Sequence, residues 1–178
     1  PSHNASFYYK IIRSQEDPKD IFVIPESEKE EIFNCKSSKT MSNDDCLRAF
    51  YFNYTIKNGP EKAFAHLARL QLDFPEMLPG CHYISHGIGH ANLQVYKGNP
   101  EKAFEVMQKS GYFKNIATCG NGYYHGVIEE FSKGVKSVDE MIVRLKSVCG
   151  NATIKKTGNC FHGVGHAAVV ELLNLKEA

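Results

Sequence analysis

A short motif built around a His-Gly pair occurs three times in the chain. It reads SHGIGHA at Ser85–Ala91, YHGVIEE at Tyr124–Glu130 and FHGVGHA at Phe161–Ala167. In each copy a second His, or a Glu, follows four residues after the first His. Residues four apart lie one turn apart on the same face of a helix, so each pair can present two ligand atoms in one direction. The candidate metal ligands are therefore His86, His90, His125, Glu129, His162 and His166.

A second repeated stretch gives the period of the chain. KNGPEKAF at Lys57–Phe64 matches KGNPEKAF at Lys97–Phe104, 40 residues later. Asn and Gly end a helix, and Pro is favoured in the first turn of the next one, so each copy marks the bend of a helical hairpin. Counting back from these bends aligns the first positions of the four copies, which are Cys46, His86, His125 and His162.

A period of about 40 residues made of two helices is typical of an α-solenoid or a bundle of α-hairpins. We therefore expect an all-α fold of about three and a half repeated helical hairpins. An irregular N-terminal segment should occupy residues 1–26, and a helical-repeat metal-binding domain residues 27–178. The layout is similar to that of tetratricopeptide-type repeats, although the characteristic residues of that repeat are absent here.

The first copy differs from the others, because Cys46 and Phe50 stand where the other copies carry ligands. This fits a terminal repeat that closes the core. Ahead of it, Ser27 and Glu30 form a capping-box signature, which predicts a short helix through Phe33. A polar loop should follow over residues 36–42.

Stacking the first helices in register would place the ligands in two rows. One row would hold His86, His125 and His162, and the other His90, Glu129 and His166. His82, one turn before His86, could extend the cluster, whereas His66 on a second helix and His3 in the tail look incidental.

Five glycines lie inside the predicted helices beside these residues, and each costs about 1 kcal/mol relative to alanine. They allow neighbouring helices to approach closely, or they leave space above the ligands for a bound group. The glycines are Gly87, Gly89, Gly126, Gly163 and Gly165.

The cysteines indicate the compartment. Their number is even, and three Asn-x-Ser/Thr sequons accompany them at Asn4, Asn53 and Asn151. Together these features favour an oxidising, extracytoplasmic (secreted) location, with buried cytosolic thiols as the alternative. Spacing favours three disulfides among the 15 possible pairings; the alternative for Cys46 is a free thiol near the site. The favoured pairs are Cys35–Cys46, Cys81–Cys119 and Cys149–Cys160.

Imidazole and carboxylate ligands suit a transition metal, with copper or zinc first and iron next, far better than calcium or magnesium. Six ligands exceed the four of a tetrahedral zinc site, so the centre is mononuclear with spare ligands or dinuclear. The His-x-x-x-His spacing resembles the histidine arrangement of type-3 copper proteins, from which Glu129 departs. The zinc-protease motif His-Glu-x-x-His lacks its general base here, because Gly follows the first His in all three copies.

Three functions follow from this pattern. The first is a metal-binding protein that is also a metalloenzyme, redox or hydrolytic. The second is a metal-storage or carrier protein without turnover. The third is a structural or filament-forming repeat protein whose His residues form a buried hydrogen-bond network. Non-covalent haem between two His pairs stays open as a further cofactor.

Charge and hydropathy limit the partners. A net charge of +1 gives no electrostatic footprint for nucleic acid, so no nucleic-acid partner is expected. No apolar run approaches the length of a membrane span. Self-association through the ends of a stacked repeat remains open.

Overall fold

The computed structural model describes residues 23–37, 40–74, 76, 80–109, 117–150 and 159–177. Across these ranges the chain forms eight α-helices and no β-strand, which confirms the all-α fold class. The irregular segment expected over residues 1–26 lies almost entirely outside the described residues, as do the sequons at Asn4 and Asn151. The helices are α2 (Glu26–Ser37), α3 (Asn43–Asn58), α4 (Pro60–Asp73), α5 (Cys81–Val95), α6 (Pro100–Lys109), α7 (Ala117–Ser132), α8 (Val138–Cys149) and α10 (Asn159–Glu177).

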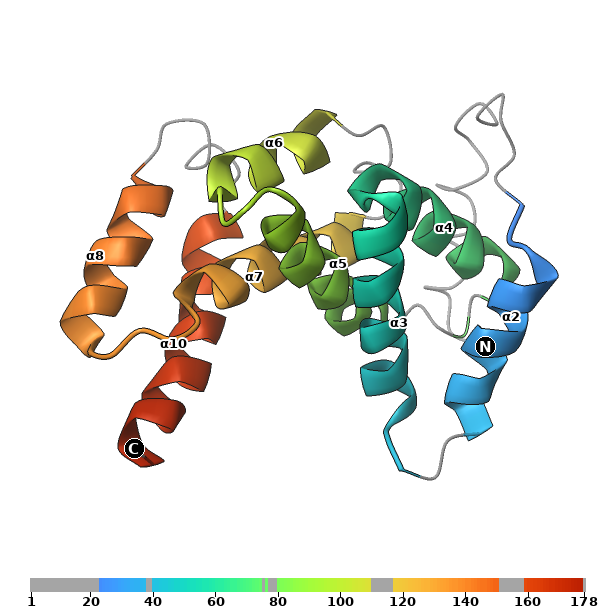
Figure 1. Ribbon diagram of the computed structural model, residues 1–178, viewed down its shortest axis with the longest axis horizontal. Helices are drawn as coiled ribbons and strands as arrows, with labels where there is room; N and C mark the ends of the chain where they lie inside the picture. The colour runs from blue at the N-terminus through green and yellow to red at the C-terminus, as the bar shows by residue number, and fades with distance from the viewer. Residues whose placement is uncertain are drawn as a thin grey trace, which may run out of the picture.

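The first helices of the expected hairpins lie side by side in chain order. α3 packs on α5, α5 on α7 and α7 on α10, with α2 against α3 at one end of the row (Figure 1). The second helices α4, α6 and α8 each pack against helices of this row. The order of elements matches a bundle of three hairpins and a last single helix. The structural equivalence of the repeats stays a prediction.

Local sequence explains where three of the eight described helices begin. The hydroxyl of Ser42 accepts a hydrogen bond from the Asp45 amide at 3.1 Å and so caps α3. Ser137 caps α8 in the same way. Gly59, at a φ of 85°, ends α3, and Pro60 opens α4 as expected.

The predicted start of α2 was wrong. The helix begins at Glu26, where the carbonyl of Pro25 accepts bonds from two amides of the first turn, so Ser27 lies inside the helix and is not its cap. The helix also continues past Phe33 to Ser37, into the expected loop. Burial of Ile32 and Cys35 against α3 accounts for this extension, because packing of an apolar face stabilises helices more than propensity does.

Aromatic side chains hold the second helices onto the row. Tyr123 packs edge-on against Phe64 of α4, with ring centroids 5.0 Å apart, and its hydroxyl donates to the carbonyl of Ala103 on α6 at 2.5 Å. Tyr124 packs on Phe104 of α6 at 4.8 Å. Both tyrosines are fully buried. They therefore fill the core next to His125 and fix the rotation of α7.

All six cysteines are paired. The disulfides join Cys35 to Cys46, Cys81 to Cys119 and Cys149 to Cys160, which confirms the favoured pairing. The alternative of a free Cys46 thiol was wrong, because that sulfur is bonded to α2. The Cys81–Cys119 bond ties the start of α5 to the start of α7, the two helices that carry most of the candidate ligands.

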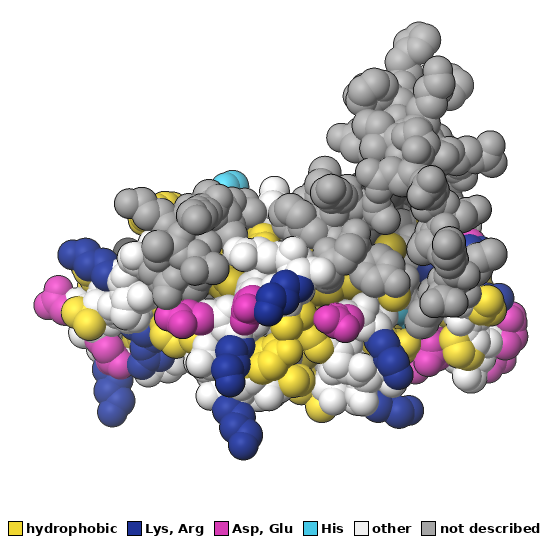
Figure 2. Space-filling view, turned by 90° about the horizontal axis from the view of Figure 1, so that it is seen from above, with side chains coloured by type: hydrophobic (Ala, Val, Ile, Leu, Met, Phe, Trp, Pro, Cys, Tyr) yellow, Lys and Arg dark blue, Asp and Glu magenta, His cyan; other side chains and the backbone are white. Residues whose placement is uncertain are grey.

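The surface is mixed in charge. On the face shown in Figure 2, Lys and Arg side chains alternate with Asp and Glu, in keeping with the net charge of +1. Among the described helices, none has both the length and the hydropathy that crossing a bilayer requires.

Candidate metal centre

The His cluster of the candidate centre forms because α5 and α7 approach closely at their glycines. A Cβ added to Gly89 would collide with the carbonyl of Tyr123, and one added to Gly126 would collide with the backbone of His86. Gly87 meets α3 in the same way, at the carbonyl of Arg48. At these three positions the glycines allow close packing of neighbouring helices, which is the first of the two explanations offered for them above. The approach brings the His residues of both helices within reach of one another.

The structure brings all six predicted ligands into one cluster. α5 supplies His86 and His90, α7 supplies His125 and Glu129, and α10 supplies His162 and His166. The predicted first row holds, since the ring of His125 lies 5.5 Å from that of His86 and 4.6 Å from that of His162. His166 joins this row as well, with its ring 4.6 Å from His125.

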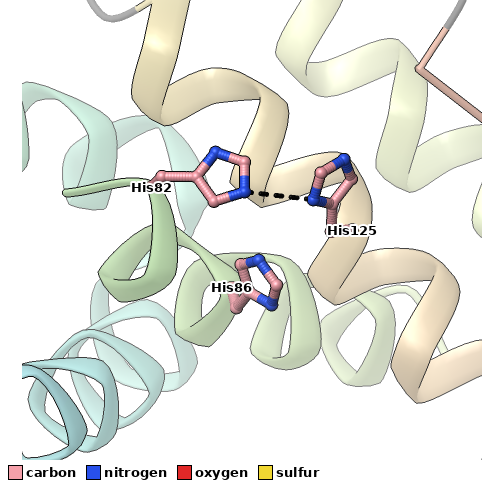
Figure 3. Close-up of side chains that lie close together, drawn as sticks. All are labelled: His82, His86 and His125. Atoms are coloured by element: carbon pink, nitrogen blue, oxygen red, sulfur yellow. Dashed lines mark hydrogen bonds between the residues drawn. The ribbon is translucent and has the colours of Figure 1, made fainter. Parts of the chain in front are cut away.

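His82 belongs to the cluster and is closer to its centre than sequence reasoning placed it. Its Nε2 lies 3.1 Å from Nδ1 of His125. His86 lies beneath this hydrogen-bonded pair, with one ring nitrogen facing it (Figure 3). The signal was present in the sequence, because 82, 86 and 90 fall on one helical face. We call His82, His86 and His125 the central triad; each offers a ligand atom, all within 4.8 Å of one another.

The rings of the central triad are steeply inclined. The interplanar angles are 62° between His82 and His86, 69° between His82 and His125, and 87° between His86 and His125. The lone pair of an imidazole nitrogen lies in the ring plane, so inclined rings can direct their lone pairs to one point. Tetrahedral nitrogen ligands at the usual zinc–nitrogen distance lie about 3.3 Å apart. The 3.1 Å between His82 and His125 is close to that spacing.

Glu129 lies on the opposite side of His86 from this pair. One carboxylate oxygen, Oε2, accepts from Nδ1 of His86 at 3.0 Å and from Nε2 of His90 at 2.9 Å. Burial raises the pKa of Glu129, but the hydrogen bonds from His86 and His90, together with the charge that these rings carry when they are protonated, outweigh it and hold the pKa at about 2. Glu129 is therefore an anion at neutral pH. These three residues form a second possible ligand group.

His86 has a buried nitrogen without a partner. Because Nδ1 donates to Glu129, the neutral ring keeps its lone pair on Nε2. His86 is only 4% exposed, and Nε2 has no hydrogen-bond partner in the described part of the protein. An unsatisfied buried acceptor costs about 1–3 kcal/mol. This nitrogen is the strongest local indication of an absent group.

His125 is held in its neutral form. Burial, reinforced by the nearby His82, His166, His86 and His162, lowers the pKa of His125 to about 3. A metal ligand must be a deprotonated imidazole, so His125 is ready to bind at neutral pH without losing a proton.

The third group, His125 with His162 and His166, is arranged differently. The rings of His125 and His162 are nearly parallel, at 5°, and those of His125 and His166 meet at 24°. Parallel rings do not direct their lone pairs to one point, so His162 would have to rotate in order to bind. Both α10 residues are exposed. Their surroundings form an open hollow of about 590 Å³, and the residues that line it within the described part of the chain all belong to α10.

Another hollow, of about 390 Å³, reaches His90 from the α3 side. Arg48, Asp45 and Gly87 line it with His90. The Arg48 guanidinium lies 4.7 Å from the centroid of the Tyr83 ring, whose hydroxyl donates to Asp45 at 2.7 Å. The cluster is thus open to solvent at both of its ends, at His90 and at His166.

His66 is a core residue, as a lone histidine usually is. It is fully buried, its Nδ1 is hydrogen-bonded to the Tyr51 hydroxyl at 2.8 Å, and its Nε2 lies 3.3 Å from Glu28. Burial lowers the pKa of His66 to about 4. Glu130, the residue after Glu129, accepts a hydrogen bond from the Gln94 side-chain amide at 2.9 Å.

Comparison of the chain with protein-family models, curated proteins and solved structures finds no match. The structure itself defines the class: an all-α, disulfide-bonded protein in which packed helices gather His and Glu side chains into groups able to hold a metal ion.

Proposed function

We propose that this protein is an extracytoplasmic metal-binding protein that holds one transition-metal ion, zinc or copper before iron, at the central triad. The observation that carries the proposal is the buried, unpartnered Nε2 of His86, which belongs to a triad of inclined imidazoles. Nitrogen ligands of this kind favour those metals over calcium and magnesium.

Five residues of the cluster have the following roles in this proposal. His82, His86 and His125 bind the ion. Glu129 accepts from the other nitrogen of His86 and so fixes its ring and its tautomer, an arrangement that is common behind metal-bound histidines. His90 holds the same carboxylate oxygen from the other side.

We assign the fourth coordination position to His166. Its ring lies 4.6 Å from that of His125 and 6.1 Å from that of His86. Because His166 is exposed, it can approach the ion or leave the fourth position to another ligand. A closed shell suits storage or transport, and an open position suits catalysis.

The three disulfides support the proposed location outside the cytoplasm, where such bonds persist. Alkylation of the unreduced protein checks this. Six reactive thiols would contradict it.

The rival function is a structural network in which the His residues only bond one another. It is favoured by the bonds that already join His82 to His125 and His86 to Glu129. It does not account for Nε2 of His86, which a closed network would have satisfied.

Elemental analysis of the full chain separates these functions. We expect about one equivalent of zinc or copper in protein purified from an oxidising compartment without added metal. His82→Gln and His86→Gln should reduce occupancy strongly, whereas His66→Gln, a matched change of a buried His outside the cluster, should keep it. Equal occupancy in all variants, or no metal in the parent after dialysis against a zinc or copper buffer, would leave the structural network as the function.

The same protein loaded with cobalt distinguishes storage from catalysis. Cobalt absorbs in the visible range according to its coordination. A spectrum that changes when azide is added indicates an open position, as an enzyme requires, and an unchanged spectrum indicates a closed shell.

A further inference from the structure

The histidines of the cluster differ in their exposure to solvent. His125 and His86 are 1% and 4% exposed, whereas His162 and His166 on α10 are exposed. An ion that moves from water to a buried site loses its hydration, and this loss is costly unless ligands replace the water molecules as they leave. The exposed pair can supply such ligands before the ion reaches the buried triad.

His125 connects the exposed pair to the triad. It belongs to the central triad with His82 and His86, and also to the group that it forms with His162 and His166. In both groups the ligand atoms lie within 4.8 Å of one another. The centroid of the His125 ring is 4.6 Å from that of each α10 ring. These short steps allow an ion to pass from the surface to the triad by exchanging one ligand at a time.

His162 suits a transient ligand better than a permanent one. Its ring is parallel to that of His125 to within 5°, so the lone pairs of the two rings do not point to one ion until His162 turns. An exposed side chain changes its rotamer within picoseconds to nanoseconds, so this turn is fast. His162 and His166 are four residues apart, the spacing at which two imidazoles of one helix bind one ion.

The opposite end of the cluster is less favourable to an approaching cation. Its hollow is lined by Arg48, a permanent positive charge, together with Asp45 and His90. Behind His90, Oε2 of Glu129 accepts from Nδ1 of His86, so on this side His86 presents an N–H and not a lone pair. The described residues that line the hollow on α10 include no charged side chain. An approach from α10 therefore meets no fixed positive charge in the described lining.

We propose that His162 and His166 form an entry site for the metal, from which an ion reaches the central triad through His125. This inference rests on the proposed function, because it requires an ion to be bound at the triad. His162 holds the ion only on the way. A ligand that acts only on the route lowers the barrier for entry and the barrier for release equally, so it changes both rates and leaves the affinity unchanged.

Stopped-flow measurements with cobalt test the entry site. Mixing the chelator-treated full chain with cobalt chloride measures entry, and transfer of bound cobalt to EDTA, extrapolated to zero EDTA, measures release. In His162→Gln both rate constants should fall about ten-fold, while the dissociation constant stays within about two-fold of the parent value. Leu173→Gln, at another exposed position of α10, should change neither rate.

Zinc binding to a chain without an intact triad gives a direct second measurement. His86→Gln lacks a triad ligand, yet calorimetry should still detect weak zinc binding at the α10 pair, and the double variant His86→Gln/His162→Gln should lose it. Unchanged rates in His162→Gln, slower rates accompanied by a loss of affinity, or weak zinc binding that the double variant retains would each overturn the entry site and leave the metal centre in place. A parent chain that binds neither cobalt nor zinc at equilibrium would overturn the metal centre, and the entry site with it.

Discussion

At the scale of single residues, Glu129 does the most to organise the centre. One of its oxygens accepts from an imidazole on either side, and it stays ionised because those bonds outweigh its burial. Sequence spacing placed it among the ligands, since it aligns with His90 and His166. In the structure Oε2 of Glu129 accepts a hydrogen bond from His86, and this bond would compete with binding of a metal ion by the same oxygen.

Replacing Glu129 by Gln tests its role. A Gln carbonyl still accepts from Nδ1 of His86, so we expect metal affinity to fall by about 10–100-fold while one ion is still bound. His86→Gln, which removes a ligand, should reduce affinity further. Competition titrations with a chromophoric chelator measure both changes. Loss of the ion from Glu129→Gln as complete as that from His86→Gln would show that Glu129 is itself a ligand.

At the scale of elements, the spacing between helices decides whether a centre can form. α5 and α7 meet backbone to backbone at Gly89 and Gly126, and α10 rests on α7 through Gly163, beside Ile128. Each glycine costs helix propensity, and the packing across the row offsets that cost. Among the helical glycines that the structure describes, Gly165 alone has no atom within 4 Å of an added Cβ, so packing does not offset its cost.

Two glycine substitutions should therefore have opposite signs. Gly89→Ala would force the Tyr123 carbonyl away and should lower the free energy of unfolding by about 1–3 kcal/mol, as overpacking does. Gly165→Ala should raise it by about 0.5–1 kcal/mol in dilute, monomeric protein, because it removes the glycine penalty from an open position. Urea unfolding followed by circular dichroism measures both free energies. Destabilisation by both substitutions would contradict the difference in packing between Gly89 and Gly165.

At the scale of the whole molecule, two buried histidines couple folding to pH. The pKa of His66 is lowered to about 4 and that of His125 to about 3. Between these values and the ordinary value near 6.5, the unfolded chain binds protons that the folded chain does not. The stability contributed by the neutral rings is therefore fully present above about pH 6.5 and is lost as the pH falls toward the folded pKa values.

We expect the chelated protein to lose several kcal/mol of stability between about pH 6.5 and 4, with each unit of pKa shift worth at most about 1.4 kcal/mol. His66→Gln removes one of the two groups, so its profile should be flatter than that of the parent. Chemical denaturation at intervals of half a pH unit measures the slope. A parent and a variant with the same slope would show that His66 does not contribute.

The sequence by itself determined the helical class, the hairpin bends and the disulfide partners, because these depend on local signals. Gly59 and Pro60 end one helix and begin another whatever packs on them, and the spacing of the cysteines favoured the three pairs that the structure contains. The spacing of four residues also identified His86, His90, His125, Glu129, His162 and His166 as neighbours. The end of α2 could not be predicted from local signals, because burial of Ile32 and Cys35 extends the helix past Phe33 to Ser37.

Only the tertiary structure decided which groups each of these residues contacts and which of them are exposed. The crossing of α5 and α7, which is fixed by their glycine contacts, sets which ring nitrogens lie close together. As a result His82 lies beside His125, and His90 contacts Glu129 and not the central triad. The exposure of His162 and His166 likewise follows from the place of α10 at the end of the row. Periodicity specifies which face of a helix a side chain occupies; the crossing of two helices specifies what that face meets, and that depends on contacts between residues far apart in the chain.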